Sequence, residues 1–231
     1  MKMPNLTQSA ETFVKEFGLY HFTRLSADAS LRDMTSRWDG QQSRLKSRIF
    51  DLEKAHGETM IAMAARDGSA RMLAEAVRAF YGTLVAKTNN NRKSPLFKTY
   101  FPDGLRAMLG VALQAETQRV GVMADKLLQE TDADLYAHFA PLNKALSGLG
   151  EATDTYDAAN EAERLAFGRI EQEKFAWLDL YKLDHRTLEQ MFYKDSTKAD
   201  SYFKPARKPK AKVTPAIAPA VHLAPSQEAT A

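Results

Sequence analysis

Apolar residues recur along most of this chain at steps of three and four, a spacing typical of amphipathic α-helices. The first long stripe runs from Leu31 to Met63 and predicts a rod-like helix with Ser30 as its N-cap. Further stripes cover four segments, residues 72–85, 105–127, 135–149 and 156–192. No alternation typical of β-strands persists anywhere. The pattern predicts an all-α fold, an elongated antiparallel bundle of four to five main helices.

A turn signal separates the first two stripes. Residues 66–69 read Arg-Asp-Gly-Ser and predict a short connection, so the stripes on either side would form an antiparallel hairpin. Asp103 is the expected N-cap of the third helix, whose apolar stripe spans residues 105–127.

The second half of the chain contains further breaks in the helical pattern. Asp132 or Asp134 is expected to begin the fourth helix, and Pro141 is expected to bend it. Gly148 and Gly150 then predict a break or kink before the last apolar stripe.

The N-terminal segment is unusually rich in aromatic residues. Residues 6–25 predict a strap that docks on the helical body, because so much apolar surface gains free energy when it leaves water. Within the strap, a short helix from Ser9 to Phe17 is expected to end at Gly18.

Residues 88–103 form the one long segment without helical periodicity. Three asparagines, two prolines and a basic pair argue against regular helix there, while its aromatic residues predict a loop packed across the end of the bundle. This loop is a candidate interaction surface, through Arg92, Lys93, Phe97, Tyr100 and Phe101. The basic pair could contact an anion, or serve only as a hydrophilic turn.

Charge is unevenly divided along the 231 residues, although the net charge is only +3. Residues 1–202 hold 27 basic and 28 acidic side chains, whereas residues 203–231 hold five basic residues and one acidic residue. This change of composition predicts a helical body over 1–202 and a disordered basic tail rich in Pro, Ala and Lys over 203–231.

The tail cations suggest anion binding. They are Lys204, Arg207, Lys208, Lys210 and Lys212. They could give weak, salt-sensitive binding to nucleic acid, or contact an acidic partner or an anionic membrane surface. The alternative is a disordered end that only adds solubility. No aromatic residue interleaves these cations, which argues against a base-stacking platform.

Several classes of protein are disfavoured by residues that are missing. The chain has no cysteine, which excludes disulfides, zinc–cysteine sites and thiol nucleophiles. The first 14 residues lack the apolar run of a secretory signal, and no stretch approaches the roughly 18 apolar residues of a membrane span. We therefore expect a cytoplasmic protein.

Glutamate and histidine residues at the helix seams are candidate metal ligands. Glu53 and His56 have the Glu-x-x-His spacing that carboxylate-bridged di-metal bundles use twice, but no second copy of the motif is present. Glu116 and His185 also interrupt apolar stripes, and such residues are more often hydrogen-bonded structure. We expect no metal and no cofactor.

Catalytic motifs are not found, since neither a phosphate-binding glycine loop nor a nucleophile elbow is present. The sequence favours a non-enzymatic structural or protein-interaction protein, acting as a scaffold or adaptor through protein partners or self-association. One alternative is a nucleic-acid-associated accessory protein that binds through its tail. The other is a metal-binding helical-bundle enzyme.

Overall fold

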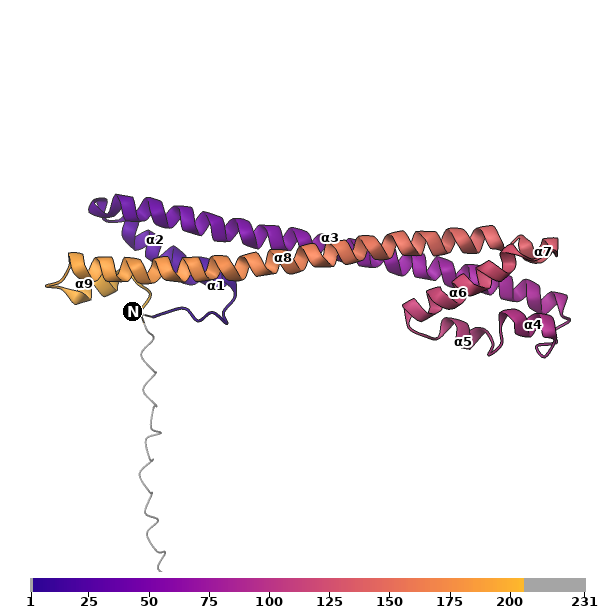
Figure 1. The fold of residues 1–231 in the computed structure, drawn as a ribbon. Helices are drawn as coiled ribbons and strands as arrows, with labels where there is room; N and C mark the ends of the chain where they lie inside the picture. The colour runs from indigo at the N-terminus through magenta and orange to yellow at the C-terminus, as the bar shows by residue number, and fades with distance from the viewer. Residues whose placement is uncertain (1, 206–231) are drawn as a thin grey trace, which may run out of the picture.

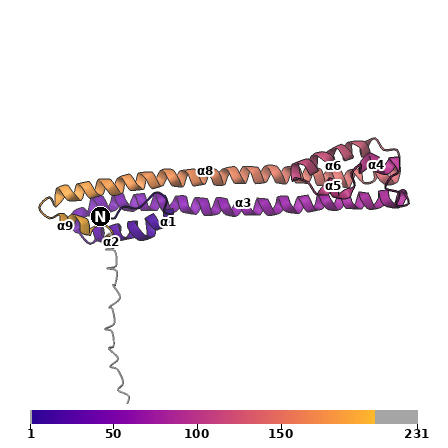
Figure 2. The same ribbon diagram turned by 90° about the horizontal axis from the view of Figure 1, so that it is seen from below.

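The computed structural model describes residues 2–205, which are mostly helical and contain no β-strand. Two helices dominate this part of the chain, α3 (Arg32–Lys87) with 56 residues and α8 (Phe139–Met191) with 53. They lie side by side and antiparallel, as two perpendicular views show (Figures 1 and 2). At 1.5 Å per residue each helix is about 80 Å long. The predicted all-α, elongated antiparallel bundle is confirmed.

One end of the rod carries a proximal lobe, in which the two ends of the described chain meet (Figure 1). Its short elements are α1 (Ala10–Thr12), the π-helical turn η1 (Phe13–Gly18), α2 (Leu19–Ser26), the 3₁₀ turn η2 (Ala29–Leu31) and α9 (Ser196–Ser201). Its core consists of fully buried aromatic and aliphatic side chains, chiefly Phe13, Phe17, Leu25, Trp38, Leu45, Trp177, Tyr181, Leu188 and Phe203.

The other end carries a distal lobe, built from the segment between the two long helices. Its elements are α4 (Pro95–Tyr100), α5 (Leu105–Leu109), α6 (Leu113–Leu128) and α7 (Ala133–Tyr136). They pack on the adjoining ends of α3 and α8 around a second core, chiefly Leu73, Val77, Phe80, Leu84, Phe97, Tyr100, Phe101, Val120, Leu127 and Leu142.

Between the lobes, α3 and α8 contact each other through small side chains. The buried positions in this stretch include Ala55, Ala62 and Ala166. Near the distal lobe, the Arg66 guanidinium lies 4.1 Å from the ring centroid of Tyr156. The large side chains therefore form two separate cores, one in each lobe.

The predicted turn at residues 66–69 is wrong, because α3 continues through it without interruption. A glycine inside a helix costs only about 1 kcal/mol relative to alanine, so Gly68 does not stop a helix that packs against α8 along its length. The antiparallel partner of α3 is therefore α8, and the expected hairpin between neighbouring stripes does not form.

The predicted break at Gly148 and Gly150 is also wrong, since α8 runs unbroken from Phe139 to Met191. The chain breaks earlier, between α7 and α8. Pro141 then falls in the first turn of α8, where its missing N–H would have had no helical partner.

Gly18 does not end the N-terminal helix, because helical backbone continues from η1 into α2. The Gly18 carbonyl accepts a hydrogen bond from Trp38 Nε1 at 3.2 Å. A Cβ atom at Gly18 would lie 1.4 Å from Gln42 Nε2, so glycine allows close packing here instead of terminating the helix.

Two predicted N-caps are replaced by neighbouring residues. Ser30 donates to the Asp28 carboxylate at 2.6 Å, and Asp28 caps η2 ahead of α3. Asp103 precedes Gly104, which has a φ of 86° and stands at the N-cap of α5. The expected helix over residues 105–127 is two helices, because α5 ends before Gly110.

Two further predictions need correction, the loop over residues 88–103 and the start of the tail at residue 203. Part of the loop is helical, since Ser94 caps α4 by accepting from the Phe97 amide and Pro95 occupies the first helical position. At the other boundary, Phe203 is only 1% exposed in the proximal core, so the folded body extends past residue 202.

Candidate functional site

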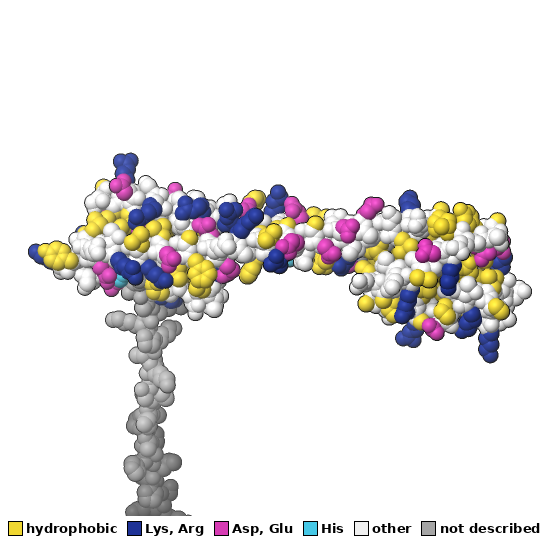
Figure 3. Space-filling model, viewed as in Figure 1, with side chains coloured by type: hydrophobic (Ala, Val, Ile, Leu, Met, Phe, Trp, Pro, Cys, Tyr) yellow, Lys and Arg dark blue, Asp and Glu magenta, His cyan; other side chains and the backbone are white. Residues whose placement is uncertain are grey.

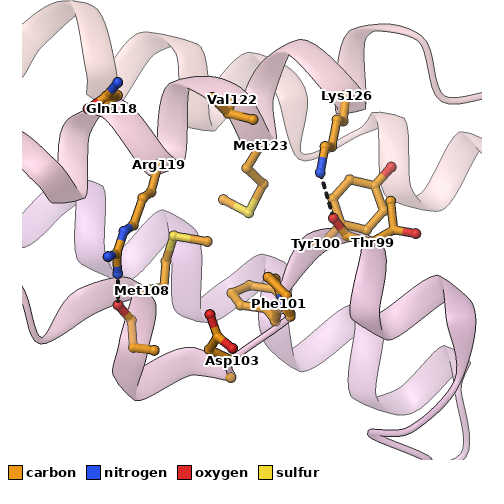
Figure 4. A pocket seen from close by; sticks show the side chains of 13 residues that line it. Thr99, Tyr100, Phe101, Asp103, Met108, Gln118, Arg119, Val122, Met123 and Lys126 are labelled. Atoms are coloured by element: carbon orange, nitrogen blue, oxygen red, sulfur yellow. Dashed lines mark hydrogen bonds between the residues drawn. The ribbon is translucent and has the colours of Figure 1, made fainter.

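Two hollows flank the connection between α4 and α5 in the distal lobe. The first, of about 350 Å³, lies between this connection and α6. Figure 4 shows Met108 and Met123 inside it, with Arg119 and Lys126 reaching across. The Lys126 ammonium donates to the Thr99 carbonyl at 2.8 Å, and Arg119 donates to the Ala107 carbonyl. Both cations therefore tie α6 to the α4–α5 segment.

The second hollow, of about 650 Å³, lies on the other side of the same connection, and we call it the basic groove. Four cationic side chains from different parts of the fold line it: Arg78 of α3, Arg92 of the loop after α3, Lys98 of α4 and Arg106 of α5. Asp103 is the one acidic residue in the lining. Figure 3 shows Lys and Arg side chains on the surface of this lobe, and also on the proximal lobe and the rod.

The four cations of the basic groove outnumber the acidic residues around them. Within residues 2–205, none of them forms a salt bridge with a carboxylate. The Lys98 ammonium donates to the Pro102 carbonyl at 2.6 Å, and the Arg92 guanidinium lies 6.0 Å from the ring centroid of Tyr81. The groove therefore presents excess positive charge to solvent.

The remaining lining is apolar. Tyr81, Leu105 and Leu109 are half-buried around the groove, and Phe97 and Phe101 close its base from within the core. Arginine beside aromatic and aliphatic surface is the composition that protein interfaces favour. The groove can therefore hold a ligand that combines negative charge with apolar surface.

Hydrogen bonds and ion pairs hold the elements around the groove in place. The buried Tyr100 hydroxyl donates a hydrogen bond to the Glu130 carboxylate at 2.7 Å. Burial raises the pKa of Tyr100, and the hydrogen bond from Tyr100 lowers the pKa of Glu130. Lys87 at the end of α3 pairs with Asp132 and with Asp134, the latter at 2.9 Å. The hydrogen bonds to Asp132 and Asp134 raise the pKa of Lys87. In turn, the hydrogen bond from Lys87 lowers the pKa of Asp132.

The candidate metal ligands lie in three different parts of the molecule. His56 contacts Glu163 at 2.8 Å across the rod, on the same helix as Glu53. His185 lies in the proximal lobe, 3.1 Å from Asp200. The residues described contain no cluster of three or more His, Cys, Asp or Glu side chains that could hold a metal ion.

Glu116 lies buried in the distal lobe, at 7% exposure. Burial raises the pKa of its carboxyl group, and the nearby Arg78 charge opposes this shift. The residue thus places a negative charge, when ionised, behind one of the cations of the basic groove.

The predicted interaction loop divides into surface and core. Arg92 lines the basic groove and Lys93 is exposed outside its lining, whereas Phe97, Tyr100 and Phe101 are at most 4% exposed. The three aromatic side chains anchor the loop, so they are not available to a partner on this surface.

Of the predicted tail cations, only Lys204 lies within the described residues. It pairs with Glu16 of η1, and its ammonium lies 5.1 Å from the ring centroid of Phe17. Lys204 therefore belongs to the proximal lobe. Arg207, Lys208, Lys210 and Lys212 lie outside the described residues.

Sequence reasoning missed most of the basic groove. A local signal existed, because residues 88–112 hold four basic residues and one acidic residue. Arg78 carried no such signal, since it is separated from the others in sequence and joins them only where α3 ends beneath α4 and α5.

Comparisons with protein-family models, with curated proteins and with solved structures find no significant match to this chain. Among the helices described, none is both long enough and apolar enough to cross a membrane.

Proposed function

We propose that this chain is a non-enzymatic interaction protein in which a stiff rod holds two lobes apart and the basic groove binds an acidic segment of a protein partner. One observation carries the proposal: four cations without salt bridges, from four segments of the fold, surround a groove with apolar walls. Leaving charges unneutralised around such a surface favours association with an oppositely charged partner.

The rod supports this proposal through its dimensions. Helices of 56 and 53 residues place the distal lobe far from the proximal lobe, and the stretch between them is only two helices thick. A spacer of this kind suits a scaffold or adaptor, because a ligand at one lobe does not obstruct contacts at the other.

Nucleic acid is the second candidate partner, favoured by the excess of basic over acidic residues in the groove lining. A phosphodiester backbone would release counterions on binding there, so its affinity would fall steeply with salt. The basic residues 204–212 lie at or beyond the proximal lobe in sequence and could add a second contact.

Fluorescence anisotropy on the full chain tests both candidates, with a labelled acidic peptide and a labelled single-stranded DNA as probes. The groove variant carries Arg78→Gln, Arg92→Gln and Arg106→Gln. The control carries Arg32→Gln, Arg169→Gln and Arg186→Gln. These changes remove the same amount of charge from exposed arginines outside the groove that form no salt bridge within the described residues. We expect the groove variant alone to weaken peptide binding by about tenfold or more.

The outcomes separate the candidates. Binding of DNA and not of the peptide, lost in the groove variant, would replace the leading proposal with the second. Equal binding of both probes by the groove and control variants would show that the groove is not the contact surface. Circular dichroism should show unchanged helicity in both variants, because all six side chains are exposed.

A further inference from the structure

An exposed apolar face runs along α3 on a side that α8 does not cover. Phe50, Ile61 and Met72 are 65%, 73% and 61% exposed, and they follow one another at steps of 11 residues. Eleven residues make just over three helical turns, so these side chains lie nearly along one line. The side of α3 that faces α8 is marked instead by buried positions such as Ala55 and Ala62.

Small residues fill most of the space between the three large side chains. The complete face, which we call the outer face, consists of Phe50, Lys54, Gly57, Ile61, Ala65, Gly68 and Met72. A Cβ atom at Gly57 or Gly68 would meet no atom within 4 Å. Packing within one chain therefore does not require glycine at either position, although glycine weakens a helix. Glycine here would let a second helix backbone approach closely.

The outer face is nearly symmetric about Ile61. Phe50 and Met72 lie 11 residues before and after it, and the small residues Gly57 and Ala65 lie four residues before and after it. Two copies of α3 laid antiparallel with Ile61 at the centre would set Phe50 against Met72 and Gly57 against Ala65, and would place the flexible Lys54 over Gly68. A twofold contact requires such self-complementarity.

Charges on one flank of the outer face match the same arrangement. In an antiparallel pair centred on Ile61, Glu53 of one copy lies within one helical turn of Arg71 of the other. Lys46 likewise lies beside Glu75 of the other copy. All four side chains are exposed, and none forms a salt bridge within residues 2–205. Both opposite-charge pairs would occur twice by symmetry.

We infer that the outer face binds a second copy of this chain, forming an antiparallel homodimer with its twofold axis at Ile61. Because Ile61 lies near the middle of α3, each proximal lobe would then lie toward the same end as the distal lobe of the other copy. The inference does not depend on what the basic groove binds.

Sedimentation equilibrium of the full chain tests the stoichiometry. The expected mass is twice the 25.8 kDa of one chain. Ile61→Lys should reduce this mass by half without loss of helicity, because its side chain is already 73% exposed. The control Leu165→Lys places the same charge at an exposed position of α8 and should leave the dimer intact. A monomeric wild-type chain would overturn the inference, as would a dimer that survives Ile61→Lys or dissociates in the control.

Cysteine crosslinking tests the orientation, since the chain has no cysteine of its own. Under mild oxidation, Ile61→Cys should crosslink to itself, because the twofold axis brings the two copies of that position together. Phe50→Cys and Met72→Cys should each fail to crosslink alone and should crosslink when mixed. Self-crosslinking of Phe50→Cys would show a parallel pair and overturn the antiparallel arrangement. No crosslink in any combination would overturn the inference that the outer face binds a second copy.

Discussion

The two lobes have similar apolar, aromatic-rich cores, but they are assembled from different parts of the chain. The proximal lobe joins residues near both ends of the described chain, so that His21 of α2 meets Tyr202 and Asp184. The distal lobe is assembled from one continuous stretch between Leu73 and Leu149. Around its basic groove, four cations that form no salt bridge within residues 2–205 remain open to solvent. This difference fits our proposal, in which the proximal lobe fastens the rod and the distal lobe offers the surface for a ligand.

A buried polar cluster fastens the proximal lobe. Asp184 and His21 are both fully buried, and Asp184 accepts from Arg37 Nη2 at 2.5 Å. The two ring nitrogens of His21 face acceptors, the Tyr202 carbonyl at 2.9 Å and the Asp184 carboxylate at 3.2 Å. The cluster therefore ties α2, α3, α8 and the segment after α9 together, with His21 and Asp184 buried and Arg37 half-exposed.

The largest effect should come from removing the centre of this cluster. Asp184→Ala removes a buried carboxylate that contacts both His21 and the half-exposed Arg37, and each hydrogen bond to a charged group contributes about 1.5–3 kcal/mol. Trp38 and Trp177 are the only tryptophans and both lie in the proximal core. We expect their fluorescence transition to move to much lower urea concentration, while hydrogen exchange in α6 stays protected.

Asp179→Ala provides the matched control for this experiment. Asp179 lies five residues earlier in α8, with a side chain that is 79% exposed and 3.6 Å from Lys182. Exposed pairs of this kind contribute at most about 1 kcal/mol. If the Asp184 variant loses protection in α6 as well, the lobes unfold as one unit and the contrast between them does not extend to stability.

A smaller loss is expected from Gly18→Ala, which tests how tightly the strap packs on α3. The added Cβ atom would overlap the buried Gln42 amide, and overpacking of this kind costs about 1–3 kcal/mol. The measurement is again the urea transition of the two tryptophans. Adding Gln42→Ala should recover part of the loss, and the absence of any recovery would show that Gln42 is not the obstacle. Gly168→Ala, where a Cβ atom meets nothing within 4 Å, should not destabilise the protein.

The sequence predicted the helices well but predicted their ends and the basic groove poorly. Stripes such as the one containing Leu45 predicted helices correctly, because burial of one face imposes the helical period. Helix ends at Gly18 and Gly68 were predicted wrongly, since a glycine signals a break only where no neighbouring helix stabilises continuation. Of the four cations that line the basic groove, only Arg92 was among the residues predicted from the sequence, because periodicity does not tell which segments meet in space.

In the distal lobe, Glu116→Gln should have a modest, pH-dependent effect. Burial raises the pKa of Glu116 above its usual 4.5, so the folded lobe binds this proton more tightly than the unfolded chain does. The carboxyl group therefore makes the lobe less stable as pH rises through the interval between the two pKa values. Glutamine removes that dependence, and at pH 7 it should stabilise the lobe by about 1 kcal/mol or less, since Arg78 partly compensates the buried charge.

Hydrogen exchange of α6 amides, compared between wild type and Glu116→Gln at several pH values, measures this effect locally. The tryptophan transition of the proximal lobe should not change. A variant that is less stable than wild type at pH 7 would show that attraction to Arg78 outweighs the cost of burial.

The smallest effect is expected in the rod, where Arg66 stacks on Tyr156 between the two lobes. Arg66→Gln removes the cation, and contacts of this type contribute about 0.5–1 kcal/mol at partly exposed sites. Because the large buried side chains lie in the lobes, we expect faster hydrogen exchange only in the amides of α3 and α8 that lie near this contact. Tyr156→Phe keeps the ring and should match wild type. If Arg66→Gln also shifts the tryptophan transition, the rod couples the stabilities of the two lobes instead of separating them.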